Sequence, residues 1–192
     1  MTVLRAFIAL EIPVDIKKAL DLETASLRQR TGSLVRWVSP ENMHLTLKFL
    51  GDVQAERLDA LSQVIQAVCN QQLPFEITTG SLGCFPNASH PRVIWIGLDA
   101  PADLLQLRGR LAEEMTGLGF PVDAHGFSAH LTIGRVREQV APGDLKKLVA
   151  SLAEQKISGS GSFSVRSVTL FKSELRPGGP LYTALFVAHL GI

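Results

Sequence analysis

Two short segments of the sequence hold the residues best suited to chemistry. His44-Leu45-Thr46-Leu47 recurs in the second half of the chain as His130-Leu131-Thr132-Ile133. Only five histidines occur in 192 residues, so chance is a poor explanation for two of them sharing one His-apolar-Thr-apolar order. Histidine can accept or release a proton near neutral pH. The repeated motif therefore predicts a site in which two imidazoles act as acid and base.

Each motif also has the alternation of a half-buried β-strand. Side chains two residues apart lie on one face of a strand, so His44 and Thr46 are expected to point the same way, with the leucines in a core. His130 and Thr132 follow the same rule. Two such strands side by side would hold both imidazoles over one small cleft.

The elements around the motifs repeat in the same order. Each half is predicted to run strand, helix, short strand, motif strand, helix, strand. The expected segments are 3–11, 13–30, 35–38, 43–50, 58–68 and 75–84, then 92–98, 101–115, 122–124, 127–134 and 142–152, followed by two late strands over 162–171 and 181–190. Asp52 is expected to cap the helix that follows the first motif.

This order predicts an α+β fold with pseudo-twofold topology. We expect a bilobal chain in which two antiparallel-rich sheets are flanked by helices and a central cleft carries both motifs. No linker is long or polar enough to separate independent domains. Residues 1–192 are therefore treated as a single bilobal domain, with the lobes divided in sequence near residue 87.

Composition narrows the class of protein further. The chain is 46% hydrophobic and 19% charged, without an apolar run that could span a bilayer or a signal-peptide cleavage pattern, which favours a cytoplasmic protein with no membrane partner. Cys69 and Cys84 are too few for a disulfide framework or a thiol zinc site. The net charge of +1 indicates that any nucleic acid is held locally, at one end.

The longer forms of the motifs, over 44–51 and 127–135, resemble the two-histidine phosphoesterase superfamily and, within it, the RNA 2′,3′-cyclic phosphodiesterase family, historically called 2′-5′ RNA ligase. Segments 5–10, 85–86, 91–95, 173–175 and 179–182 are also similar, so the resemblance covers nearly the whole chain. One departure is Ala129, where the family usually has proline. We expect it to affect how the strand begins more than the chemistry.

The resemblance implies hydrolysis of a terminal 2′,3′-cyclic phosphate to a 2′-phosphate, with neither metal nor cofactor. It makes His44 the general acid toward the leaving 3′ oxygen and His130 the general base toward water, although the residues themselves leave these two roles exchangeable. Thr46 and Thr132 are expected to donate hydrogen bonds to the phosphate oxygens or to orient the water and imidazoles. Arg135 is the expected cation for the charge on those oxygens.

Strand alternation complicates three substrate-binding candidates. Arg135 is five residues from His130 and reaches the same face only if the strand ends, twists or bulges at Gly134. Lys48 shares the parity of His44 and is a second candidate cation. Phe49 is the best candidate to stack on a terminal base, despite its odd parity relative to His44. Core positions are expected for Trp37 and Trp95.

Other functions are open at this stage. The same site could run in reverse and join RNA ends as a 2′-5′ ligase, or the chain could be a binding module for nucleotides or RNA ends that does not turn them over. A zinc site lacks the necessary ligand spacing. His90, His125 and His189 have no motif context and are not expected to be catalytic. The expected partners are RNA ends or nucleotides with a 2′,3′-cyclic phosphate, bound by a monomer without a protein partner.

Overall fold

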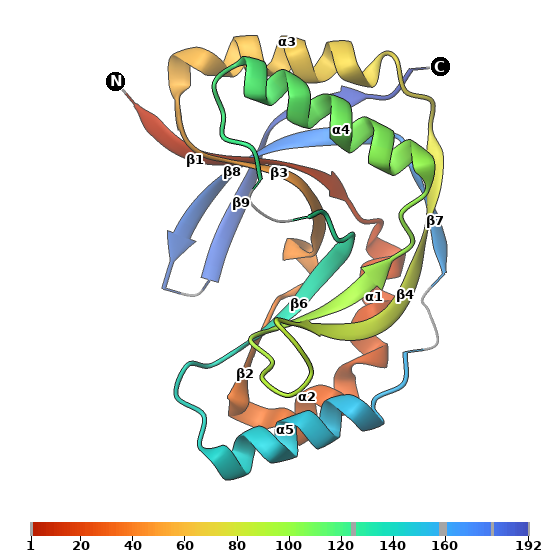
Figure 1. Cartoon of the computed structure of the whole chain (residues 1–192), viewed down its shortest axis with the longest axis vertical. Helices are drawn as coiled ribbons and strands as arrows, with labels where there is room; N and C mark the ends of the chain where they lie inside the picture. Colours follow the sequence, from red (N-terminus) through yellow and green to blue (C-terminus); the bar gives the residue numbers. More distant parts are fainter. Residues whose placement is uncertain (1, 124–125, 158–160, 178, 192) are drawn as a thin grey trace.

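The computed structural model of the chain describes residues 2–123, 126–157, 161–177 and 179–191. Within these residues two antiparallel sheets are accompanied by five α-helices (Figure 1). The elements in chain order are β1 (Val3–Glu11), α1 (Val14–Glu23), α2 (Ala25–Thr31), η1 (Gly32–Leu34), β2 (Val35–Trp37), η2 (Pro40–Asn42), β3 (His44–Gln54), η3 (Ala55–Arg57), α3 (Leu58–Cys69), β4 (Phe75–Phe85), β5 (Val93–Leu98), α4 (Ala102–Gly117), β6 (His130–Val136), α5 (Pro142–Glu154), β7 (Ser162–Val165), β8 (Ser167–Arg176) and β9 (Gly179–His189).

The strand orders of the two sheets confirm the predicted pseudo-twofold topology. The first sheet runs β3-β1-β8-β9 and the second runs β2-β6-β5-β4-β7. In each sheet the motif strand pairs with the first strand of its own half, β1 or β5. That first strand then pairs with β8 or β4, and one further strand follows. The α+β class and the two antiparallel sheets are therefore as the sequence predicts.

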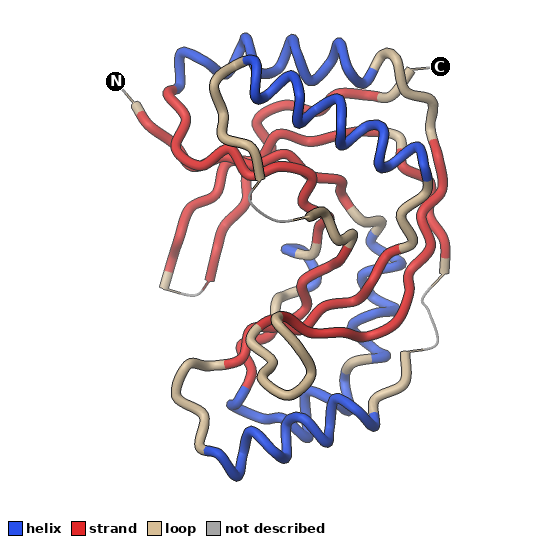
Figure 2. Tube along the Cα trace, viewed as in Figure 1, coloured by secondary structure: helices blue, strands red, loops and turns tan. Residues whose placement is uncertain are grey.

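The sheets do not follow a cut of the chain near residue 87. Strand β4 ends before that point and lies in the second sheet, whereas β8 and β9 come from the C-terminal part and complete the first sheet. The helices are exchanged too: α4 packs against α3 and β3, and α2 packs against α5 and β2. Figure 2 shows these two helix groups on the outer sides of the sheets. The expected division corresponds to no boundary between sheets, because each sheet needs strands from both halves.

Apolar periodicity explains helices α3 and α4, which cover the first sheet. Leu61, Ile65 and Val68 form the buried stripe of α3, and residues spaced by three and four on α4 are fully buried. Strand β1 supplies an unbroken buried run from Ala6 to Leu10, as expected of a central strand with both faces covered.

Several predicted boundaries are wrong. The helix expected over 13–30 divides at Thr24, whose hydroxyl donates to the Leu20 carbonyl oxygen at 2.8 Å, an arrangement that often bends helices. Asp52 is not a helix cap, because β3 continues to Gln54 and pairs Asp52 with Arg5. The late strand over 162–171 is two strands separated by Arg166.

A short strand was expected over 122–124. Residues 121–123 are irregular, and residue 124 lies outside the described part of the chain. Across the residues that the structure describes, no helix is long and apolar enough to cross a membrane.

Candidate active site

The two motif histidines occupy equivalent positions in the fold. His44 opens β3 and His130 opens β6, and these two strands contact each other. The Nδ1 atom of His44 lies 2.8 Å from the carbonyl oxygen of Asn42, and that of His130 lies 2.6 Å from the carbonyl oxygen of Ser128. A carbonyl oxygen only accepts, so each Nδ1 carries the proton and donates it. Each Nε2 is left to accept or donate the proton that chemistry requires.

Aromatic side chains enclose the ring of His44. Its centroid lies 4.8 Å from that of Phe7, 5.1 Å from that of Tyr182 and 6.3 Å from that of Phe171. The pKa of His44 is lowered from 6.5 to about 4, chiefly by burial and to a smaller extent by the positive charges of Lys17 and His130, against the backbone hydrogen bond to Asn42. In the free protein His44 is therefore neutral at pH 7, and its ring lies within electrostatic range of His130.

His130 has a more open aromatic environment. Phe85 meets the ring edge-on at 5.0 Å, and the centroid of Trp95 lies 6.2 Å away. The sequence suggested a core position for Trp95, but this partly exposed ring contacts His130 and lies across Gly83, where a Cβ would collide with the indole. Trp37 lies on the opposite side of the second sheet, over Gly134 and beside Arg28.

Both motif strands contain a β-bulge at the same place. In β3, Thr46 pairs with Ala9 and Lys48 pairs with Ile8, which leaves Leu47 as the extra residue. In β6, Thr132 and Gly134 pair with consecutive residues of β5, which leaves Ile133 extra. One extra residue reverses the alternation of all side chains that follow it. The last residue of each four-residue motif is thus the point at which the strand changes parity.

The bulges decide where Arg135 and Phe49 point. Arg135 pairs with Val93 and Thr132 pairs with Trp95, and directly paired residues share a face, so Arg135 lies on the face of His130. Phe49 pairs with Phe7, whose ring contacts His44, and is 64% exposed. We call these two faces, which carry the motif histidines and threonines, the site face of each sheet. Phe49 and Arg135 occupy equivalent positions on them, five residues after each histidine.

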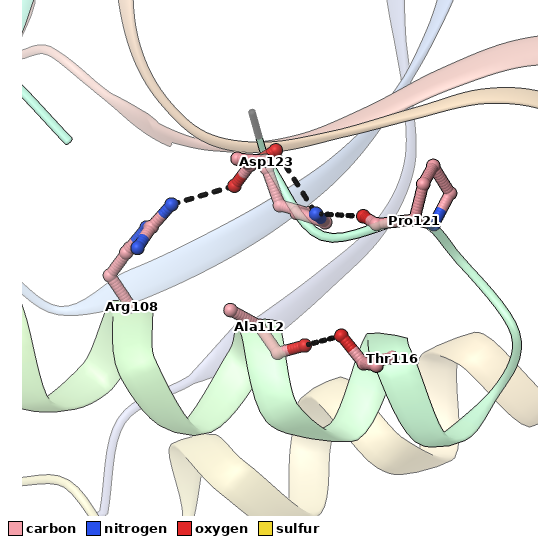
Figure 3. A network of polar contacts seen from close by, with 6 residues as sticks. Arg108, Ala112, Thr116, Pro121 and Asp123 are labelled. Atoms are coloured by element: carbon pink, nitrogen blue, oxygen red, sulfur yellow. Dashed lines mark hydrogen bonds and ion pairs between the residues drawn. The ribbon is translucent and has the colours of Figure 1, made fainter. Parts of the chain in front are cut away.

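Lys48 is directed away from the site face by the same bulge. Its side chain is 1% exposed, and its Nζ donates to the carbonyl oxygen of Pro121 and pairs with Asp123 Oδ1 at 3.0 Å. Arg108 holds the other oxygen of Asp123 at 2.6 Å, and Figure 3 shows Arg108, Asp123 and Pro121 in this network. The expectation that Lys48 binds substrate is corrected: the side chain joins β3 to the segment that leads toward His130.

Thr46 and Thr132 share the site faces of their histidines and are partly buried. Of the other histidines, His90 is exposed in a loop and His189 is exposed on β9, while His125 lies outside the described residues. Over the ranges that the structure describes, no three His, Cys, Asp or Glu side chains are grouped as a metal would require.

Tyr182 lies beside His44 but is not among the candidates that the sequence predicts. It comes from β9, meets the ring of His44 edge-on, and is close enough to Arg135 and Arg5 for their charges to act on it. Burial raises the pKa of its phenol, against the effect of those two arginines. The signal was present, because Tyr182 is the only tyrosine of the chain and ends one of the segments that carry the resemblance.

Known proteins similar to this chain in sequence and in structure are phosphoesterases of one family. The model of the family "LigT like Phosphoesterase" matches twice, over residues 10–95 and 96–182, so each match contains one motif. The RNA 2′,3′-cyclic phosphodiesterase of Methanothermobacter thermautotrophicus is 34% identical over 97% of this chain and 98% of its own. That of Archaeoglobus fulgidus is 36% identical over 96% and 99%. The structure of E. coli LigT complexed with 3′-AMP superposes with a TM-score of 0.76 at 26% identity, covering 98% of this chain and 99% of that one.

Proposed function

The chain belongs to the LigT-like phosphoesterase family, and we propose that it is an RNA 2′,3′-cyclic phosphodiesterase that opens the cyclic phosphate to a 2′-phosphate. The observation that carries the proposal is the duplicated histidine arrangement. Two imidazoles on contacting strands each donate Nδ1–H to the carbonyl oxygen two residues earlier. Such a pair can supply an acid and a base to a single phosphate.

The reaction needs one proton transfer at each histidine, to one imidazole and from the other. His130 Nε2 takes a proton from water as the water oxygen bonds to phosphorus. The bond between phosphorus and the 3′ oxygen breaks, and His44 Nε2 gives its proton to that oxygen. Each transfer is worth roughly 10²- to 10⁴-fold in rate. The family resemblance supports this assignment of roles, while the matching Nδ1 hydrogen bonds serve either assignment.

The burial of His44 places a condition on the assignment. A general acid must be protonated before it reacts, but burial favours the neutral ring in the free protein. A cyclic phosphate carries one negative charge, and an anion beside an imidazole favours its protonated form. We propose that substrate binding raises the pKa of His44, so that the acid forms only when the phosphate is present.

The neighbouring residues have roles that follow from their faces. Thr46 and Thr132 would donate hydroxyl hydrogen bonds to the phosphate oxygens from the two site faces. Arg135, now on the His130 face, would balance the negative charge that grows on those oxygens. Phe49 presents an exposed ring on the His44 face, where the terminal base could stack.

We propose that the substrates are RNA ends or nucleotides with a 2′,3′-cyclic phosphate, and that the protein acts on them as a monomer in the cytoplasm. E. coli LigT was crystallised with 3′-AMP, a single nucleotide. The net charge of +1 of this chain suits recognition of a short RNA end better than many phosphate contacts along a long RNA. Cys69 and Cys84 are free, as is usual in a reducing compartment.

The test is hydrolysis of an oligoribonucleotide that ends in a 2′,3′-cyclic phosphate, in EDTA, by wild type, His44→Ala and His130→Ala. We expect wild type to release a 2′-phosphate and each variant to lose at least about 100-fold in rate. Product identity is read against 2′- and 3′-phosphate standards. Absence of turnover in EDTA, restored by added metal, would contradict the two-histidine mechanism.

A further inference from the structure

Two arginines lie directly opposite each other beside the second motif. Arg36 on β2 pairs with Arg135 on β6, and both side chains are exposed. Directly paired residues share a face, with Cβ atoms roughly 5 Å apart. Arg36 is therefore on the site face of the second sheet, together with His130 and Thr132, while its neighbour Val35 is buried on the other face.

Nothing that the structure describes neutralises this pair of charges. Like charges directly opposite each other destabilise a sheet. The ion pairs found among the described residues involve other arginines and lysines, and neither Arg36 nor Arg135 makes one. β2 is an edge strand, so Arg36 has no further strand beside it. Two unpaired guanidinium groups on one exposed face form a ready site for an anion.

The pair borders the histidines. The charge of Arg135 acts on Tyr182, which contacts the ring of His44. Along β6 the rise is about 3.3 Å per residue, so the bulged stretch from Thr132 to Arg135 spans roughly 7 Å and that from His130 roughly 13 Å. An arginine side chain extends back over part of that length. Arg135 can therefore reach back toward the reacting phosphate, whereas Arg36, one strand further out on the edge strand β2, lies about one nucleotide from the histidines.

We propose that Arg36, beside Arg135, binds a second phosphate of the substrate, the one on the 5′ oxygen of the terminal nucleotide, while Arg135 faces the cyclic phosphate. This inference rests on the proposed function. A 2′,3′-cyclic phosphate ends the RNA chain, so every other phosphate lies on its 5′ side. The planar guanidinium fork suits bidentate contact with phosphate oxygens. The chain thus distinguishes an RNA end or a 5′-phosphorylated nucleotide from a nucleoside cyclic phosphate.

The test compares adenosine 2′,3′-cyclic phosphate with and without a 5′-phosphate, in wild type and Arg36→Gln. We expect the 5′-phosphate to raise kcat/KM of wild type roughly 10-fold, mainly through KM, and Arg36→Gln to abolish that gain while leaving the substrate without a 5′-phosphate unchanged. Arg36→Lys should keep part of the gain, because it retains the charge but not the fork. For a single-stranded oligonucleotide, the slope of log KM against log salt should fall by about 0.7 in Arg36→Gln.

Arg166→Gln is the matched control, since it removes an exposed arginine that precedes β8 and follows β7 at the opposite edge of the same sheet. Equal loss on both substrates in Arg36→Gln, or an unchanged 5′-phosphate preference, would overturn the inference while the proposed function stands. If wild type turns over neither substrate, the proposed function fails, and the inference is judged by binding. Arg36→Gln should then lower the affinity for adenosine 2′,5′-bisphosphate and leave the affinity for adenosine 2′-monophosphate unchanged. If variant and wild type bind both nucleotides equally well, the role of Arg36 is refuted.

Discussion

The partly buried imidazole of His44 should make the stability of this protein fall as the solution becomes acidic. Phe7, Phe171 and Tyr182 surround the ring, and burial lowers its pKa from 6.5 to about 4. The unfolded chain exposes the same ring and binds a proton near 6.5. Between these values the unfolded state holds more protons than the folded state, so falling pH favours unfolding.

The size of the effect follows from the shift. The loss of folding stability caused by His44 is absent well above pH 6.5, grows as the pH falls, and is complete below about pH 4. At one pKa unit per 1.36 kcal/mol, it amounts to about 2 kcal/mol at pH 5 and about 3 kcal/mol at pH 4. Other groups titrate over the same range, so the informative quantity is the difference between wild type and a variant without this ring.

His44→Asn is the variant of choice, because its amide can still donate to the Asn42 carbonyl oxygen. The free energy of unfolding is measured by urea denaturation at pH 7 and pH 5. Between pH 7 and pH 5 the free energy of unfolding of wild type should fall by about 2 kcal/mol more than that of His44→Asn. His90→Asn, which removes an imidazole from an exposed loop, is the control. Equal losses in wild type and His44→Asn would refute the burial argument.

Three further predictions concern the site and its support. Inorganic phosphate should raise the pKa of His44, measured by NMR titration of its ring protons, and an unchanged pKa would remove the basis for His44 as the acid. Phe49→Ala should raise KM for a cyclic nucleotide roughly 10-fold through lost base stacking, with less than about 0.5 kcal/mol of stability lost at this exposed position, whereas an unchanged KM would exclude stacking there. Asp123→Ala should lower the free energy of unfolding, measured by urea denaturation, by roughly 3 kcal/mol, because it leaves the buried ammonium of Lys48 without its ion pair. Adding Lys48→Met to the same chain should restore most of that free energy. A loss that the double variant does not recover would argue against the ion pair as its cause.

Local pattern was sufficient for the motifs themselves. The alternation of His44 with Thr46 and of His130 with Thr132 required only the two-residue period of a strand, and these pairs do share their faces. The α+β class and the two antiparallel sheets also followed from the order of apolar segments. These features depend on residues close together in sequence, which is why they could be predicted.

The residues beyond the motifs were decided by pairing between strands. Whether Leu47 and Ile133 are extra residues depends on the register against β1 and β5, which no local period encodes. That register turned Lys48 into the core and brought Phe49 and Arg135 onto the site faces. Extrapolated alternation had assigned all three to the opposite sides.

The sequence by itself determined the two His-x-Thr motifs, their strands and the family that they resemble. Tertiary structure decided the rest, because the remaining contacts join distant segments. It exchanged β4 and β8 between the sheets, brought Tyr182 from the C-terminal hairpin to His44, and placed Arg36 opposite Arg135. Strand register and strand exchange are set by the partner strand and not by the strand's own residues, so they emerge only when the whole chain is folded.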